Sequence, residues 1–325
     1  MNIINNGKTK NLEKAIAEVI AFFDLFDYPL TAFEIWRFCR IESKLAEIII
    51  VLDNNNDAGF LKIIDSLEGF YFLSGRDSII KIRKDRYNYT DRKFKRAIMI
   101  TKIFKIIPWL KMIAVGNLIG LHNLKDKSDI DLFIVTEKGR IWLSRFFCIL
   151  ITKFLGLRPS PGRERDKICL SFFVSEERLD LRELMLGNNL ENFTTAFRNK
   201  DIYFIYWLAG LAPIYNQGGI YKKFVDANNW IKVYLPNWQP GEPNYNRQAG
   251  RGFSKFYHDV VDMLSGGTEK IFTKIQLKLM PLKLKEIINK DTRVVVNNKI
   301  LKLHVKDRRE EYREKFNKKI VEILQ

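Results

Sequence analysis

The chain has 325 residues, of which 46% are hydrophobic and 13% aromatic, so it holds enough apolar material for about two or three packed domains and is not a disordered protein. Lysine and arginine number 55 against 38 aspartates and glutamates, a net charge of +17. This excess fits a polyanionic partner such as nucleic acid and equally fits a compositional bias towards lysine, so only the clustering of the charge distinguishes the two.

The three cysteines, Cys39, Cys148 and Cys169, are an odd number without paired spacing, which argues against a disulfide framework and against a zinc site. The N-terminal segment lacks the apolar core of a signal peptide. The most apolar later stretches, Ile98–Val115 and Ile141–Leu157, are each interrupted by basic residues and do not predict a membrane span. We therefore expect a soluble, cytoplasmic protein with no membrane partner.

The N-terminal residues, 1–75, predict three helices followed by a hairpin. The expected elements are Leu12–Phe26, a short helix from Thr31, Ser43–Asp53, and a hairpin of Phe60–Ile64 and Gly69–Leu73 with Asp65–Glu68 as its turn. Thr31 and Glu34 have the spacing of a capping box, which marks the start of the short helix. This order of elements is the outline of a winged-helix domain.

Two blocks of positive charge lie outside this domain. Residues 76–105, within a predicted connecting helix over 76–108, contain eleven Lys or Arg against three Asp, and residues 270–325 contain sixteen against seven acids. If the two blocks converge in space, they form a surface for RNA or DNA; if they do not, they are solvated helix faces.

Residues 109–185 predict an α/β core and 186–325 a mainly helical C-terminal region. The expected core elements are strands at Lys111–Val115, Ile130–Val135 and Ile168–Val174, and a helix over Arg140–Leu155. The C-terminal region is expected to contain a loop over 236–252, helices broken near Gly266-Gly267 and Pro281, a hairpin near 294–305 and a final charged helix.

The chemistry concentrates at the join between the first two core strands. The first strand runs into Gly116 and Asn117, and the second opens with Ser128-Asp129-Ile130-Asp131. Side chains alternate along a strand, so Asp129 and Asp131 project from one face, close enough to share a divalent cation. Such a cation relieves the repulsion between the two carboxylates and presents nucleotide phosphates. Gly116 lets the backbone approach a phosphate.

This stretch resembles the nucleotidyltransferase superfamily typified by DNA polymerase beta, whose signature is an apolar strand, Gly-Ser, a loop and Asp-x-Asp on the next strand. The chain as a whole looks like a group of bacterial proteins with an N-terminal winged helix, FDYPLT at Phe26–Thr31, SDIDLFIV at Ser128–Val135 and KDRRE at Lys306–Glu310. The resemblance implies that Asp129 and Asp131 are catalytic and hold Mg²⁺ or Mn²⁺. It further implies that an NTP is the substrate, bound near Gly116, Asn117 and Ser128.

The sequence departs from the family pattern at two places. Asn117 replaces the usual serine, and the strand Ile168–Val174 has no acid where the family carries a third carboxylate. The acids nearest that strand are Asp166, Glu176, Glu177 and Asp180. Two functions therefore stay open: a nucleotidyltransferase acting on a hydroxyl acceptor, possibly RNA, and a weak or inactive nucleotide-sensing regulator that binds nucleic acid. A transferase for small cationic acceptors is disfavoured by the charge of +17.

His122, His258 and His304 are scattered without ligand spacing, and we expect no role for them in a site. Arg308 and Arg309 are expected to be a solvated helix start, with a contact to phosphate as the less favoured alternative.

Overall fold

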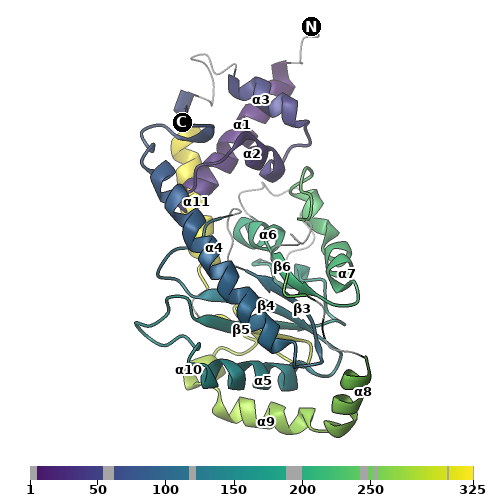
Figure 1. The fold of residues 1–325 in the computed structure, drawn as a ribbon. Helices are drawn as coiled ribbons and strands as arrows, with labels where there is room; N and C mark the ends of the chain where they lie inside the picture. Colours follow the sequence, from purple (N-terminus) through teal and green to yellow (C-terminus); the bar gives the residue numbers. More distant parts are fainter. Residues whose placement is uncertain are drawn as a thin grey trace.

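The computed structural model describes residues 6–53, 62–116, 122–187, 200–241, 248–250, 252, 255–305 and 307–324. Within these ranges the chain forms eleven α-helices, a mixed sheet of six strands and a separate sheet of two strands (Figure 1). The fold is therefore α+β, as predicted at that level. None of the described helices is both long and apolar enough to cross a membrane.

The N-terminal end contains three helices and a hairpin in the predicted order. The elements are α1 (Asn6–Asp24), α2 (Ala32–Phe38), α3 (Leu45–Asp53), β1 (Ile64–Leu67) and β2 (Phe70–Leu73). The capping box of α2 is confirmed, because the Glu34 N–H donates to Oγ1 of Thr31 at 3.3 Å and the Thr31 N–H donates to the Glu34 carboxylate at 2.9 Å. These bonds satisfy backbone donors that the first helical turn leaves without partners.

The hairpin turn lies further along the chain than predicted. The sequence pattern places the turn at Asp65–Glu68, but Asp65 to Leu67 pair within the hairpin, and Glu68 and Gly69 make the turn with φ of 53° and 77°. Two consecutive left-handed residues give the twist that joins antiparallel strands best, and a glycine at the second position adopts it without strain. Asp65 and Ser66, which the sequence pattern assigns to the turn, are exposed residues of the strand β1.

The predicted basic helix is α4 (Ile79–Phe104), which runs diagonally along the sheet (Figure 1). Arg83 lies 2.7 Å from a carboxylate oxygen of Glu34, whose side chain is 2% exposed. Seven of the eleven basic residues in 76–105 form ion pairs, namely Arg76, Arg83, Lys84, Arg86, Arg92, Lys93 and Lys95. Most of the positive charge of this block is therefore engaged in ion pairs within the chain, some buried and some on the surface.

The six-stranded sheet contains the predicted strands and one that the sequence did not reveal. In spatial order it consists of β6 (Ala212–Asn216), β3 (Leu110–Val115), β4 (Ile130–Thr136), β5 (Ile168–Ser175), β8 (Ile300–Leu303) and β7 (Val294–Val296). Only the β4–β5 pair is parallel. The predicted hairpin near 294–305 is present as β7 and β8. Three strands from within 186–325, the region predicted to be mainly helical, thus belong to the same sheet as the core.

Helices cover both faces of this sheet (Figure 1). One face packs against the second half of α4 and against α5 (Ile141–Phe154), on which α9 (Glu269–Leu279) lies, and the other packs against α6 (Ile202–Ala209) and α7 (Ile220–Ala227). α11 (Arg309–Leu324) packs on α6 and on α1, which extends the second core towards the N-terminal helices. The alternation along β4 divides its side chains accordingly, because Ile134 joins the first core and Phe133 the second. The two remaining helices are α8 (Lys255–Leu264) and α10 (Leu282–Lys285). Asp131 shares the parity of Phe133 and therefore faces α6 and α11.

A buried ion pair joins α11 to α6. Arg309 lies 2.9 Å from Oδ2 of Asp201, and their side chains are 3% and 0% exposed. Asp201 caps α6 by accepting from the Phe204 N–H, and Arg309 also pairs with Asp307. The expectation of a solvated helix start is therefore wrong for Arg309. Its charge is neutralised by Asp201, which lies 108 residues earlier in the chain, and by its near neighbour Asp307.

We predict that Arg309→Met lowers the free energy of unfolding by about 3 kcal/mol, because it leaves Asp201 as a buried charge without its partner. Arg313→Met is the control on the same helix: its partner Glu310 is 69% exposed, and the expected change is below about 0.5 kcal/mol. Urea unfolding of both variants at pH 7 measures the difference. Equal losses would contradict the prediction.

Candidate active site

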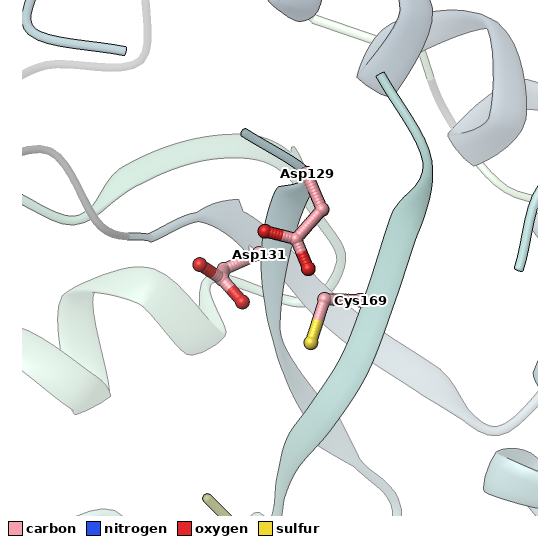
Figure 2. Close-up of side chains that lie close together, drawn as sticks. All are labelled: Asp129, Asp131 and Cys169. Atoms are coloured by element: carbon pink, nitrogen blue, oxygen red, sulfur yellow. The ribbon is translucent and has the colours of Figure 1, made fainter. Parts of the chain in front are cut away.

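Two aspartates mark the start of β4, where the sequence predicts them. Asp129 immediately precedes the strand and Asp131 is its second residue, and their carboxylates point to the same side (Figure 2). The backbone at this point is held to β3, because the Gly116 N–H donates to the Asp131 carbonyl at 2.9 Å. The alternation of a strand thus brings two carboxylates together beside Gly116, the residue that follows β3.

A bulge in β5 adds a cysteine to this pair. The parallel register brings Cys169 opposite Asp131 and Phe172 opposite Phe133. Between these two pairs β5 advances by three residues while β4 advances by two, so β5 has one extra residue. This extra residue keeps both Cys169 and Phe172 on the side of the aspartates, which strict alternation does not allow. The donor atoms of Asp129, Asp131 and Cys169 lie within 4.8 Å of one another (Figure 2).

A buried lysine from α4 holds the two strand starts. Lys93, whose side chain is 0% exposed, donates to the Ser128 carbonyl and to the Asp166 carboxylate, the latter at 2.8 Å. The Asp166 N–H donates to the same Ser128 carbonyl at 3.1 Å. Burial alone would raise the pKa of Asp166, but the bonds from Lys93 and Arg92 outweigh it and lower the pKa. Asp166 therefore supports the site from behind and is not part of the cluster.

The remaining acids considered for a third carboxylate lie elsewhere. Glu176 and Glu177 bind Lys138 at the far end of β5, and Asp180 accepts from the Arg182 N–H. Among the described residues, the cluster at the start of β4 thus contains two carboxylates and one thiol.

The cluster concentrates charge where water is scarce. Burial raises the pKa of Asp129, with a backbone hydrogen bond and the charge of Lys93 acting against it. Burial also raises the pKa of the Cys169 thiol well above its usual value, and the two aspartates raise it further. Burial is the main cause of both shifts, so negative charge at this place is unfavourable. A divalent cation compensates that charge, and the oxygen and sulfur donors are of types that bind such ions.

These residues form one wall of a cavity of about 440 Å³. A second wall comes from β8, which pairs with β5, and from the residues between β8 and α11, with Lys302, His304 and Arg308. Lys302 donates to Asp307 at 2.9 Å, and burial lowers its pKa to about 8, with Arg309 adding to the effect. Arg308 is more than half exposed and binds Glu311, so it is the most accessible cation of the wall. The cavity lining therefore contains both the two aspartates of β4 and an accessible cation, Arg308.

Aromatic rings close the cavity between the two charged walls. Tyr203 of α6 and Tyr312 of α11 stack with a centroid distance of 5.2 Å and an interplanar angle of 2°. The guanidinium of Arg308 lies 4.9 Å from the centre of the Tyr312 ring. Trp207 stacks on Phe172 from the other side. Flat, partly exposed rings beside an exposed cation are suited to a ligand with both a planar group and a negative charge.

The predicted nucleotide-binding residues have different fates. Gly116 lines the cavity, but its φ is not positive. A Cβ at this position would lie 3.4 Å from the Trp207 ring, so the group that the Gly116 backbone approaches closely in this structure is the indole of Trp207. Ser128 turns away: its hydroxyl donates to the Lys125 carbonyl at 2.9 Å, and it is not among the described residues that line the cavity. Asn117 lies outside the described residues.

Sequence reasoning missed the residues that β5 and β8 contribute. His304, expected to have no role, lines the cavity with its Nε2 2.9 Å from Oγ of Ser171. Cys169 in turn donates to Ser171 at 3.3 Å. Burial lowers the pKa of His304 to about 4, and the charge of Lys302 contributes, so the ring is neutral at pH 7. No spacing in the sequence signals this, because β5 and β8 meet only in the folded sheet.

Comparisons of the chain with protein-family models, with curated proteins and with solved structures find no match. The chemistry of the site therefore has to be inferred from its own residues. They combine three potential metal ligands, a neutral imidazole, an exposed guanidinium and a stacked pair of tyrosines around one cavity.

We predict that His304 makes the protein acid-sensitive. Its pKa in the folded state is about 4, below the ordinary value of 6.5, so between these values the unfolded chain binds a proton that the folded chain does not. Stability therefore falls as the pH drops from 6.5 to 4. His304→Gln, which keeps a partner for Ser171, should flatten that decline in urea unfolding midpoints.

His258 is the matched control with the opposite sign. Burial would lower its pKa, but bonds to Glu137 and Asp259 outweigh it and raise the pKa. Its contribution to stability is complete below pH 6.5 and is lost as the pH rises through the folded pKa. His258→Gln should therefore leave the slope between pH 6.5 and 4 unchanged and remove the gain in stability that wild type shows as the pH falls towards 6.5. Parallel pH profiles for both variants would refute the assignment.

Proposed function

We propose that the protein is a metal-dependent nucleotidyltransferase that moves a nucleoside monophosphate from an NTP to a hydroxyl acceptor. The observation that carries the proposal is a single cavity with Asp129 and Asp131 on one wall and Arg308 on the other. Its volume of about 440 Å³ lies within the range of roughly 300–1,000 Å³ typical of small-molecule sites. In this proposal Arg308 binds the negative charge of the triphosphate, and Asp129 and Asp131 bind the metal ion that accompanies it.

Each wall has a distinct task in this proposal. Asp129 and Asp131 would hold Mg²⁺ or Mn²⁺, which when bound neutralises phosphate charge and aligns the attacking and leaving oxygens. Arg308 binds phosphate oxygens with its planar fork of donors, for which it exchanges Glu311. Tyr203 and Tyr312 line the cavity beside Arg308, and we expect the base to contact them. The side chains thus orient the substrate, and orientation with charge neutralisation is the main requirement of phosphoryl-type transfer.

A nucleotide-sensing regulator with weak or no transferase activity is the second candidate. One observation favours it: the described cluster contains two carboxylates rather than three. A sensor and an enzyme both bind the nucleotide, but only an enzyme forms labelled product. Incubation of the purified chain with each labelled NTP, Mg²⁺ or Mn²⁺ and total RNA separates the two.

The nucleic-acid part of the proposal rests on the second basic block, since most of the first is engaged in internal ion pairs. In that block the lysines of α9 and α10 are exposed: Lys270, Lys274, Lys278, Lys283 and Lys285. They lie at the end of the molecule formed by α5, α9 and α10 (Figure 1). Five exposed lysines on neighbouring turns provide a surface to which a phosphate backbone is attracted.

We predict that Asp131→Asn abolishes transfer and that Arg308→Ala weakens nucleotide binding about tenfold or more, because a hydrogen bond to a charged group is worth about 1.5–3 kcal/mol. Arg313→Ala, on the helix that directly follows Arg308 but outside the cavity lining, is expected to bind as wild type does. Formation of labelled product from a labelled NTP checks the Asp131→Asn variant, and titration with a fluorescent NTP analogue and Mg²⁺ measures the affinity of the other two. Unchanged affinity in Arg308→Ala would exclude the basic wall as the phosphate site.

For the acceptor, we predict that affinity for single-stranded RNA falls linearly with salt on logarithmic axes, with a slope of about 0.7 per phosphate neutralised. Replacing Lys274, Lys278 and Lys283 by glutamine should reduce the slope by about 2. The control is the same substitution at Lys315, which pairs with Glu311 on α11. Binding that is insensitive to salt, or absent, would leave the charge as compositional.

A further inference from the structure

We infer that Cys169 is the third ligand of the metal site and that the site prefers a thiophilic divalent cation of the Zn²⁺ and Co²⁺ class over Mg²⁺. The inference rests on the proposed function in placing the metal at Asp129 and Asp131. It goes further in assigning a ligand and a metal class. Three protein donors leave at least one coordination position open for a phosphate oxygen or water, as in catalytic zinc sites.

The position of Cys169 is the first argument. It lies directly opposite Asp131 on the neighbouring parallel strand, and its sulfur is within 4.8 Å of the ligand oxygens of both aspartates (Figure 2). The bulge that follows it in β5 is what allows the sulfur to share the cavity with Phe172. A cysteine used only for packing has no need of this geometry, whereas a ligand does.

The surroundings are the second argument. Cys39 and Cys148 are buried, but Cys169 is partly exposed and lines the cavity. Its polar neighbours form a short chain, from Sγ to Oγ of Ser171 at 3.3 Å and on to Nε2 of His304 at 2.9 Å. Hydrogen-bonded groups behind a ligand orient it and raise its affinity for the metal. On coordination the thiol becomes a thiolate, and its proton is released to solvent.

The donor set is the third argument. Mg²⁺ takes oxygen ligands in a regular octahedron and is a poor match for sulfur. Zn²⁺ and Co²⁺ accept carboxylate oxygen and thiolate sulfur in one site, with Zn–S near 2.3 Å and Zn–O near 2.0–2.2 Å. Two carboxylates and a thiol in a partly enclosed cavity therefore select the softer ions. In this inference a thiol takes the place of the third carboxylate, so the site keeps three ligands and changes the metal that it prefers.

The test is titration of the full chain with Co²⁺, followed by the near-ultraviolet absorption of thiolate-to-Co²⁺ charge transfer. We expect wild type to show the band with saturation at equimolar Co²⁺, Cys169→Ser to lose it, and Cys148→Ser to keep it. Zn²⁺ should displace Co²⁺ and abolish the band, whereas excess Mg²⁺ should not. A band that survives in Cys169→Ser, or Co²⁺ binding without any band, overturns the assignment.

Cys169→Asp tests the preference from the other direction. It supplies the third carboxylate and should shift the ratio of Mg²⁺ to Zn²⁺ affinity towards Mg²⁺ by about tenfold or more, with an unchanged circular dichroism spectrum as the check on folding. An unchanged ratio overturns the inference. Transfer assays keep the two proposals apart: wild type that transfers with Mg²⁺ but shows no thiolate band refutes the inference alone, and a thiolate band without transfer under any metal refutes the transferase alone.

Discussion

A buried lysine and the carbonyl and carboxylate it binds hold the active-site end of the sheet together. Lys93 reaches from α4 to Ser128 before β4 and to Asp166 before β5, so both strands begin where the helix fixes them. Asp129 and Cys169 are each within three residues of these contacts, so the same contacts place the cluster of Asp129, Asp131 and Cys169. Because a buried charge without its partner is strongly unfavourable, the helix, the two strand starts and the cluster have to form together.

The sequence predicts well what depends on near neighbours. The capping box of α2 and the shared face of Asp129 and Asp131 follow from spacings of three and two residues, and both are present. What it does not predict depends on partners far along the chain. The bulge in β5 needs β4 beside it, and the neutral His304 needs Ser171, 133 residues away. Alternation counted along an isolated strand therefore finds the aspartates but not the cysteine that faces them.

Charge shows the same limit. The excess of basic residues in 76–105 is visible in the sequence, but the acids that bind them come from other elements: Glu34 from α2, and Asp126 and Asp166 from the loops before β4 and β5. The surplus of lysine and arginine in α4 thus forms ion pairs that join α4 to other elements, whereas the lysines of α9 are exposed on the surface. Which of the two occurs is decided by the tertiary partners and not by composition.

The place of β8 between β5 and β7 has a consequence for synthesis in the cell. β5 and β8 are adjacent in the sheet, yet Ser171 leaves the ribosome 133 residues before its partner His304. At about 5–20 residues per second, β5 waits on the order of ten seconds with one edge unpaired. An open strand edge of this kind, with Phe172 and Phe173 in it, is a template for pairing with other chains. During this interval the open edge of β5 can pair with a chaperone or with a strand of another chain before β8 has been synthesised.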